Sequence, residues 1–523
     1  MQQVSIGRVL GAYGRIAAGM VAASAAALSI GCGGGGGGGS IANQPFWAGY
    51  GRSAQHTAIS DVSTVPLTKV KWTHTVDATN PTGTIYIHYG SPSITRANTI
   101  IVPVRTGASS FRFDALAGAT GTQLWTTDTD YIVAPHDWVP SCSGVISPSG
   151  RFYYPGAGGT ILYRDAPDSA TPPTNGTGRI VFYGTANYAG ANIATYNANL
   201  YINTPITADS AGNIYFGVMS TGATPTNTAS SIVKIDKTGV ATAVSITSLS
   251  ADMTKIAHNC APAVSNDGTL VYFGINNTNG SGASAGYLVA LKTSNLTIAG
   301  KIKLKDPKSG NDAGVYDAGT ASPTVGPDGD VYYGVLESPF GGNHGRGFML
   351  HYDSQLVTTK TPAAFGWDDT ASIVPATMVP SYKGASTYLL CIKYNNYADG
   401  GGDGHNRVAV VDPGQSAVES ISGVTCMAEV LTVLGPTPDS GFPGVPGAVR
   451  EWCINSAAVD PGTKSVIINC EDGHCYRWSL VTNALTEDVF LASPTAEAYT
   501  PTLIGPDGTS YAINDATLNA VGK

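Results

Sequence analysis

Residues 325–333 read Val-Gly-Pro-Asp-Gly-Asp-Val-Tyr-Tyr, which is a short apolar strand, a turn containing Asp-Gly and a second strand rich in aromatic residues. The same pattern returns along the chain at residues 146–154, 206–216, 264–272 and 503–511. Weaker copies turn at Asn98, Gly384 and Gly462. Eight such units, spaced 46 to 78 residues apart, are typical of a propeller or a solenoid.

Most units continue into further strands. A third strand follows the aromatic one, as in residues 111–114, and the first unit adds a tight turn and a fourth strand that ends at Trp125. Four antiparallel strands in a unit indicate a propeller blade. The last unit reaches Val521 with three strands, and residues 70–77 resemble 124–128, so a strand from the front of the domain can complete it and cover its exposed edge. We predict an all-β, eight-bladed β-propeller of four-stranded antiparallel blades, closed by an N-terminal strand; seven blades is the alternative.

The composition agrees with strands and turns. Of the 523 residues only 12% are charged, 42% are hydrophobic and 65 are glycine. Long helices rich in Glu, Lys and Arg do not fit these numbers. A formal charge of −8 without a run of Lys or Arg argues against nucleic acid as a partner.

The first residues have the pattern of an export signal. Arg8 and Arg15 precede an apolar stretch that ends at Gly31-Cys32, and residues 28–32 resemble a bacterial lipobox in which Ser29 stands where Leu is preferred. An ordinary secretory cleavage is the alternative. We predict a lipoprotein-type signal peptide over 1–31, a lipidated Cys32 with a glycine-rich tether over 32–44, and the propeller over 45–523. The protein is then exported and anchored to a membrane of the bacterial cell envelope, on the periplasmic side or at the cell surface.

An exported chain can hold disulfides, and seven cysteines follow Cys32. Cys470 and Cys475 flank a four-residue turn, where residues on opposed strands can reach bonding distance. We expect a disulfide between these two, and the odd total leaves at least one thiol free.

Several of these segments resemble the pyrroloquinoline quinone (PQQ) repeat. The resemblance lies in residues 90–94, the Asp-Gly turns, the stretch from Phe113 to Trp125, and residues 46–57, which are similar to the opening segment of such propellers. It covers roughly residues 45–523 and implies the propeller fold. It does not decide the cofactor, because the same repeat builds quinone enzymes, outer-membrane assembly scaffolds and many binding proteins.

The long loops, rich in Gly, Asn and Thr, all fall on the face opposite the Asp-Gly turns. We expect the binding site at the mouth of the channel on this loop face, since function concentrates in loops held by a rigid scaffold. Polar and aromatic residues precede the innermost strands there; the candidates are His88, His136, Asp137, Trp138, His258, Asn259, Tyr316, Asp317, Arg450, Glu451 and Trp452. The alternative is that they only line a hydrated channel.

One loop has oxygen ligands that suit calcium. Asp399 and Asp403 are separated by glycines in residues 395–405, although the spacing matches no EF-hand and a plain surface loop is the alternative. No catalytic residue can be assigned by motif, and no metal site is firm.

We therefore expect a cell-envelope lipoprotein whose propeller is a non-catalytic platform that binds an envelope protein, a polymer or a small ligand at its mouth. The alternative is a periplasmic PQQ-dependent oxidoreductase of alcohols or sugars, with PQQ and calcium as cofactors. Asp137 or Asp317 would then be the base, and Trp138 or Trp452 the surface on which the quinone stacks. The adjacent-cysteine pair of the quinone-dependent alcohol dehydrogenases does not occur in this sequence.

Overall fold

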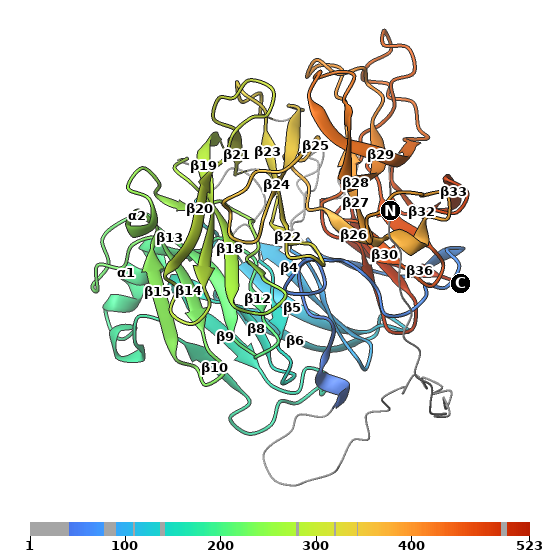
Figure 1. The fold of residues 1–523 in the computed structure, drawn as a ribbon. Coiled ribbons are helices and arrows are strands. Elements are labelled where there is room, and N and C mark those ends of the chain that lie inside the picture. The colour runs from blue at the N-terminus through green and yellow to red at the C-terminus, as the bar shows by residue number, and fades with distance from the viewer. Residues whose placement is uncertain are drawn as a thin grey trace, which may run out of the picture. The chain divides into compact units, whose positions relative to one another are not determined.

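The computed structural model describes residues 41–77, 90–107, 110–135, 142–278, 282–317, 319, 321–342, 344–492 and 499–523. These residues form a nearly all-β structure of mostly four-stranded sheets that follow one another along the chain (Figure 1). Neighbouring strands within every sheet are antiparallel, as the sequence predicts. No helix in this part of the chain has the length and apolar character needed to cross a membrane.

The sheets are given in chain order. The first contains β1 (Pro45–Trp47), β3 (Ser93–Thr95), β4 (Thr99–Gly107), β5 (Ser110–Ala117) and β6 (Gln123–Thr129). The second contains β7 (Val145–Ile146), β8 (Phe152–Pro155), β9 (Ile161–Arg164) and β10 (Thr177–Ile180). The third contains β11 (Leu200–Ile202), β12 (Thr207–Ala208), β13 (Ile214–Ser220), β14 (Ser231–Ile235) and β15 (Ala241–Ser245).

A ten-stranded sheet follows, made of two units that join where β19 pairs with β21. Its first unit contains β16 (Lys255–Ile256), β17 (Ala263–Val264), β18 (Leu270–Asn276), β19 (Ala283–Lys292) and β20 (Ile298–Lys303). Its second unit contains β21 (Gly314–Tyr316), β22 (Thr324–Val325), β23 (Val331–Leu336), β24 (Gly347–Tyr352) and β25 (Ala363–Ala364).

Three four-stranded sheets complete the chain. The first contains β26 (Ser372–Pro375), β27 (Tyr388–Tyr394), β28 (Arg407–Val418) and β29 (Thr425–Leu434). The next contains β30 (Ala458–Asp460), β31 (Ser465–Asn469), β32 (His474–Ser479) and β33 (Ala484–Phe490). The last contains β34 (Leu503–Ile504), β35 (Ser510–Asn514), β36 (Thr517–Gly522) and β2 (Lys69–Thr75). The short helices are η1 (Ile41–Asn43), η2 (Ala157–Gly159), η3 (Thr185–Asn187), α1 (Asn192–Asn199), α2 (Ile246–Leu249) and η4 (Ala376–Met378).

The repeated turns have the conformation that their glycines allow. In the turn of residues 265–268, the backbone N–H of Gly268 donates to the carbonyl of Ser265 at 2.9 Å, and Gly268 has φ +72°. Gly329 repeats this geometry with φ +90°. A side chain is disfavoured at positive φ, so the recurrence of glycine at this place in the repeat has a direct steric reason.

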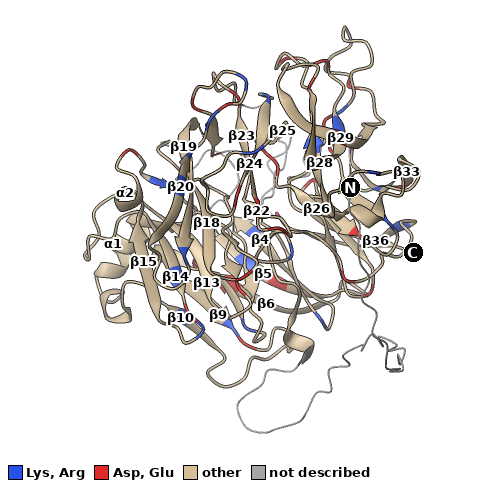
Figure 2. Ribbon diagram, in the orientation of Figure 1, with Lys and Arg blue, Asp and Glu red and all other residues tan. Residues whose placement is uncertain are grey.

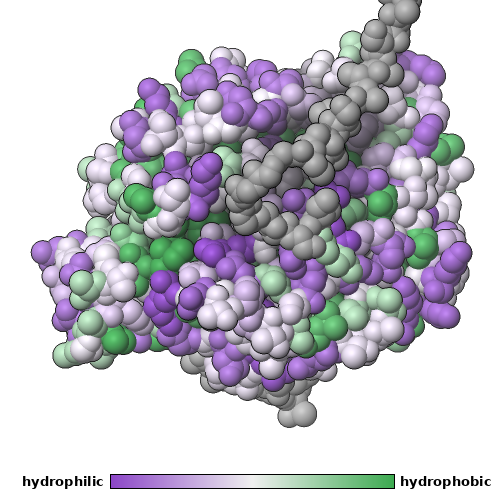
Figure 3. All heavy atoms as spheres, turned by 90° about the horizontal axis from the view of Figure 1, so that it is seen from below, coloured by the Kyte–Doolittle hydropathy of each residue, from purple (hydrophilic) through white to green (hydrophobic). Residues whose placement is uncertain are grey.

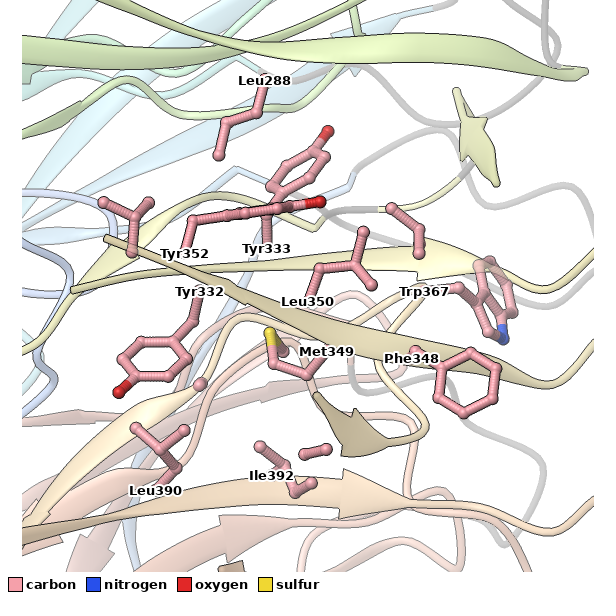
Figure 4. Close-up of a cluster of buried hydrophobic side chains, with 14 of the residues drawn as sticks. Leu288, Tyr332, Tyr333, Phe348, Met349, Leu350, Tyr352, Trp367, Leu390 and Ile392 are labelled. Atoms are coloured by element: carbon pink, nitrogen blue, oxygen red, sulfur yellow. The ribbon is translucent and has the colours of Figure 1, made fainter. Parts of the chain in front are cut away.

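Alternate residues of each strand pack against the sheets on either side. The Tyr332 hydroxyl lies 2.6 Å from that of Tyr388 in the following sheet, whereas the adjacent Tyr333 faces Gly274 and Cys260 of the preceding sheet unit. Figure 4 shows this arrangement, with Leu390 on one side of the strands and Leu288 on the other. The core therefore lies between the sheets.

The last sheet connects back to the first. β2 pairs with β36 from Lys69 opposite Gly522 to Thr75 opposite Thr517. Trp72 of β2 also donates from its indole nitrogen to the carbonyl of Gly118, at 2.9 Å. Residues of both sheets share one buried cluster, to which Ile100 and Ile513 belong.

Residues 48–58, which we call the axial segment, contact one short strand in each of five sheet units. Its carbonyl groups accept backbone hydrogen bonds from Ile146 of β7, Val264 of β17, Val325 of β22, Ile373 of β26 and Val459 of β30. These five strands belong to five sheet units, and they can reach eleven consecutive residues only if they converge on them. Ile146, Val264 and Val325 directly precede the glycine turns, so the segment lies at the short-turn end of these strands.

Candidate functional site

Five of the predicted site residues, Cys32, His88, His136, Asp137 and Trp138, lie outside the described residues. The other predicted residues lie between sheets and on the loop face. Figure 2 shows basic and acidic residues scattered over the ribbon, and the face in Figure 3 mixes hydrophilic with hydrophobic residues.

Asp317 is part of a buried polar cluster. Its carboxylate contacts the ammonium group of Lys255 and accepts hydrogen bonds from the Asn276 amide at 2.8 Å and the backbone N–H of His258 at 3.1 Å. Asp317 is 0% exposed and Lys255 is 2% exposed. Because the donors come from the preceding sheet unit, the cluster ties two units together.

Asn259 and Tyr316 also bridge neighbouring sheets. The Asn259 backbone N–H donates to the carbonyl of Asn203 at 3.0 Å, and its side-chain amide donates to the carbonyl of Gly319 at 3.4 Å. The Tyr316 ring packs edge-on against Trp367, with centroids 5.2 Å apart. These contacts connect the inner ends of successive sheets.

The Trp452 side chain is buried, whereas the sequence predicts that it is exposed. The sequence predicts an aromatic surface open to a ligand, but this side chain is 0% exposed and packs edge-on against Tyr476, with centroids 5.8 Å apart. Its backbone N–H donates to Asn395 in the preceding sheet unit at 3.1 Å. Trp452 is therefore packed among core residues in this structure, and ligand stacking on it stays a prediction that would require its ring to become exposed.

A second buried ion pair was not predicted from the sequence. The Lys393 ammonium lies 3.1 Å from a carboxylate oxygen of Asp368, and both residues are at most 2% exposed. The same ammonium lies about 6 Å from the ring centroids of Trp367 and Tyr499. Nothing in the local sequence around Lys393, which is one residue of an apolar strand, indicates this partnership.

The partly exposed charges of the loop face come from three consecutive sheet units. His344 lies between β23 and β24, Asp399 between β27 and β28, and Arg450 and Glu451 between β29 and β30. His344 bridges two carboxylates, with Nδ1 2.9 Å from Asp399 and Nε2 3.3 Å from Glu451. Arg450 donates to Glu471 at 2.9 Å. We call His344, Asp399, Arg450, Glu451 and Glu471 the rim cluster.

Burial, hydrogen bonds and neighbouring charges shift the pKa values of three residues of the rim cluster. The hydrogen bond to Glu451, supported by Asp399, outweighs burial and raises the pKa of His344 to about 9. Burial favours the neutral form of Glu451, but the hydrogen bond and charge of His344 lower the pKa of Glu451 to about 2. Burial, and then the negative charge of Glu451, raise the pKa of Glu471 to about 8. The two glutamates therefore retain one proton between them at neutral pH.

A cavity of about 260 Å³ opens beside this cluster. His344, Asp399, Arg346 and Glu337 are among its lining residues. The loop face thus presents a charged hollow whose walls come from two neighbouring sheet units.

Asp399 and Asp403, the pair considered for calcium, have different partners in the structure. Asp399 contacts His344, whereas Asp403 lies 3.3 Å from Arg407 and 3.4 Å from His405. Each carboxylate therefore faces a positively charged or protonatable group of the protein itself.

The expected disulfide is absent. Cys470 and Cys475 are both free thiols. Asn469, not Cys470, pairs with Cys475, so the two side chains point to opposite faces of the sheet and belong to different buried clusters.

No family model matches the chain, and no curated protein matches its sequence. Solved structures do match its fold. A europium-containing methanol dehydrogenase has a TM-score of 0.54 at 11% identity, over 90% of this chain and 89% of that chain. The quinohemoprotein alcohol dehydrogenase from Comamonas testosteroni has a TM-score of 0.52 at 11% identity, over 92% and 81%. BamB from Moraxella catarrhalis has a TM-score of 0.42 at 11% identity, over 87% and 97%. The chain therefore has the fold of the PQQ-like repeat β-propellers.

Proposed function

We propose that this protein is an exported, non-catalytic binding platform that takes a protein, polymer or small ligand of the cell envelope on its loop face. The observation that carries the proposal is the contrast between the two ends of the sheets. The axial segment occupies the short-turn end, whereas loops from three consecutive units bring the rim cluster to the other end, beside the 260 Å³ cavity. A rigid scaffold with charged loops on one face favours recognition.

The scaffold in this proposal is an eight-bladed ring closed by β2. The pairing of β2 with β36 and the hydrophobic cluster common to the first and last sheets support closure. Closure removes the exposed strand edge on which other chains could pair. Cys32, the predicted lipid attachment site, would hold this ring to the membrane through its glycine tether.

A quinone-dependent oxidoreductase is the second candidate, because two of the matched structures are alcohol dehydrogenases by name. Four described side chains fit a quinone poorly, and of these only Trp452 was expected to hold it. Trp452 and Trp367 are 0% and 4% exposed. Lys255 and Lys393 are paired with Asp317 and Asp368. A flat quinone with three carboxylates requires an exposed aromatic surface and unpaired cations.

Reconstitution separates the two candidates. The purified protein is incubated with PQQ and calcium, desalted, and its absorbance spectrum and dye-linked alcohol oxidation are recorded. The platform proposal predicts a protein spectrum without quinone and no oxidation. Quinone that stays bound in a one-to-one ratio and supports oxidation would replace it with the enzyme.

A further inference from the structure

Next to the rim cluster, a thiol and two carboxylates point toward one another. The sulfur of Cys453 lies 3.2 Å from a carboxylate oxygen of Glu471. One ligand atom from each of Glu451, Cys453 and Glu471 lies within 4.8 Å of the other two. Cys453 is 0% exposed, and the side chains of the two glutamates are each 14% exposed. The group thus combines a buried sulfur with two oxygens at the edge of the loop face.

We propose that Glu451, Cys453 and Glu471 form a binding site for a divalent transition-metal ion, zinc being the best match. Zinc binds sulfur at about 2.3 Å and carboxylate oxygen at about 2.0–2.2 Å, usually in a tetrahedron. The edges of such a tetrahedron measure about 3.3–3.7 Å by geometry from those bond lengths. The Cys453–Glu471 separation is already close to this range, so small side-chain rotations suffice to bring the three donors to one ion.

The donor types select the metal. A thiolate disfavours calcium and magnesium, which prefer oxygen alone, and a pair of carboxylates disfavours Cu(I), which prefers sulfur. A mixed set of one sulfur and two oxygens suits zinc, or cobalt as its spectroscopic substitute. With three protein ligands, the fourth position is left to water, which can arrive from the side of the cavity beside His344.

The charges around the site balance a divalent ion. Ionised Glu451, Cys453 and Glu471 carry three negative charges, against one positive charge on Arg450, which donates to Glu471. A divalent cation brings this sum to zero. His344 also holds Glu451 in place from outside the site, at 3.3 Å, as partners of metal-binding carboxylates do.

The site does not rest on the proposed function, because it needs no partner on the loop face. The competing interpretation is that the thiol and the carboxylates only share protons. That interpretation predicts the same contacts in the metal-free protein and no affinity for cobalt or zinc.

Cobalt titration of the full protein, stripped with a chelator, distinguishes the two. We expect one equivalent of Co²⁺ to bind and to give a thiolate-to-cobalt charge-transfer band in the near ultraviolet, which zinc then abolishes. Cys453→Ser should remove the band. The matched control is Cys426→Ser, since Cys426 is an equally buried free thiol outside the group and its loss should leave the band unchanged.

Two further variants test cobalt binding at the same site if Cys453→Ser folds poorly. Glu471→Gln removes one ligand charge and should weaken cobalt binding by at least tenfold, with a circular dichroism spectrum like that of the wild type. His344→Asn removes the partner of Glu451 and should weaken it by about tenfold. The proposal is overturned if the wild-type protein gives no charge-transfer band, or if Cys453→Ser retains the band at wild-type intensity.

Discussion

The Nδ1 atom of His56 lies 2.7 Å from the carbonyl oxygen of Pro323, a contact that fixes the axial segment to the start of β22. The imidazole is 0% exposed and packs edge-on against Tyr50, with ring centroids 5.1 Å apart. Burial lowers the pKa of His56 to about 4, although the hydrogen bond to Pro323 opposes the shift. A neutral histidine therefore connects the axial segment to the residue that precedes β22.

This histidine makes the protein sensitive to acid. Above pH 6.5 His56 is neutral in both the folded and the unfolded chain, so it does not change stability there. As the pH falls from 6.5 towards 4, the unfolded chain takes up a proton that the folded one does not, and the free energy of unfolding decreases. From pH 7.5 to pH 5 the loss should be about 2 kcal/mol.

Urea denaturation of the wild type and of His56→Gln at both pH values checks this. The difference in stability between the two proteins should shift by that amount in favour of the variant at pH 5. The same difference at both pH values would show that His56 is not the group responsible.

A substitution at Gly51 tests how tightly the axial segment is packed. Gly51 has φ +59°, and a Cβ added there would lie 2.7 Å from the Cβ of His56. Gly51→Ala should therefore cost about 3 kcal/mol, from backbone strain and overpacking together. Gly268→Ala is the matched control, since Gly268 has φ +72° with no atom within 4 Å of an added Cβ, and should cost only about 1–2 kcal/mol. The free energy of unfolding is measured in thermal or urea melts. An equal decrease in the two variants would contradict tight packing around Gly51.

The connection between the last and the first sheet depends on Trp72. Its indole nitrogen bonds to Gly118, and its ring lies 5.7 Å from that of Tyr511. Trp72→Ala should lower the free energy of unfolding by about 2 kcal/mol or more, because it deletes packing and a hydrogen bond at once. Phe490→Ala removes an aromatic ring that is 58% exposed, and should change stability by less than about 0.5 kcal/mol. A Trp72 variant as stable as the Phe490 variant would contradict closure through β2.

The antiparallel strands and the strong glycine turns could be predicted from the sequence. The turn at Gly268 recurs at Gly150, Gly212, Gly329 and Gly508 because a glycine accommodates the positive φ of this position. The pairing of β2 with β36 was also predictable, because residues 70–77 resemble the fourth strand of the first unit. These features depend on short stretches of chain.

The site was predicted less well, because its properties depend on packing between sheets. Trp452 precedes an inner strand as expected, but Tyr476 of a later strand covers it. Cys475 faces away from Cys470 because Asn469 takes the pairing position, a difference of one residue in register. Glu471 lies in the turn between β31 and β32, and no sequence pattern links it to Cys453. The contact between the two side chains forms only in the folded structure.

Site-specific photo-crosslinking tests the central proposal most directly. A photoreactive amino acid is placed at Asp399, an exposed residue of the rim cluster, and separately at Asp267, an exposed residue of a short turn on the opposite end of the sheets. After irradiation of cells of the native host, binding at the loop face predicts discrete adducts from position 399 and none from position 267. Adducts from position 267 alone would contradict a platform that binds at its loop face.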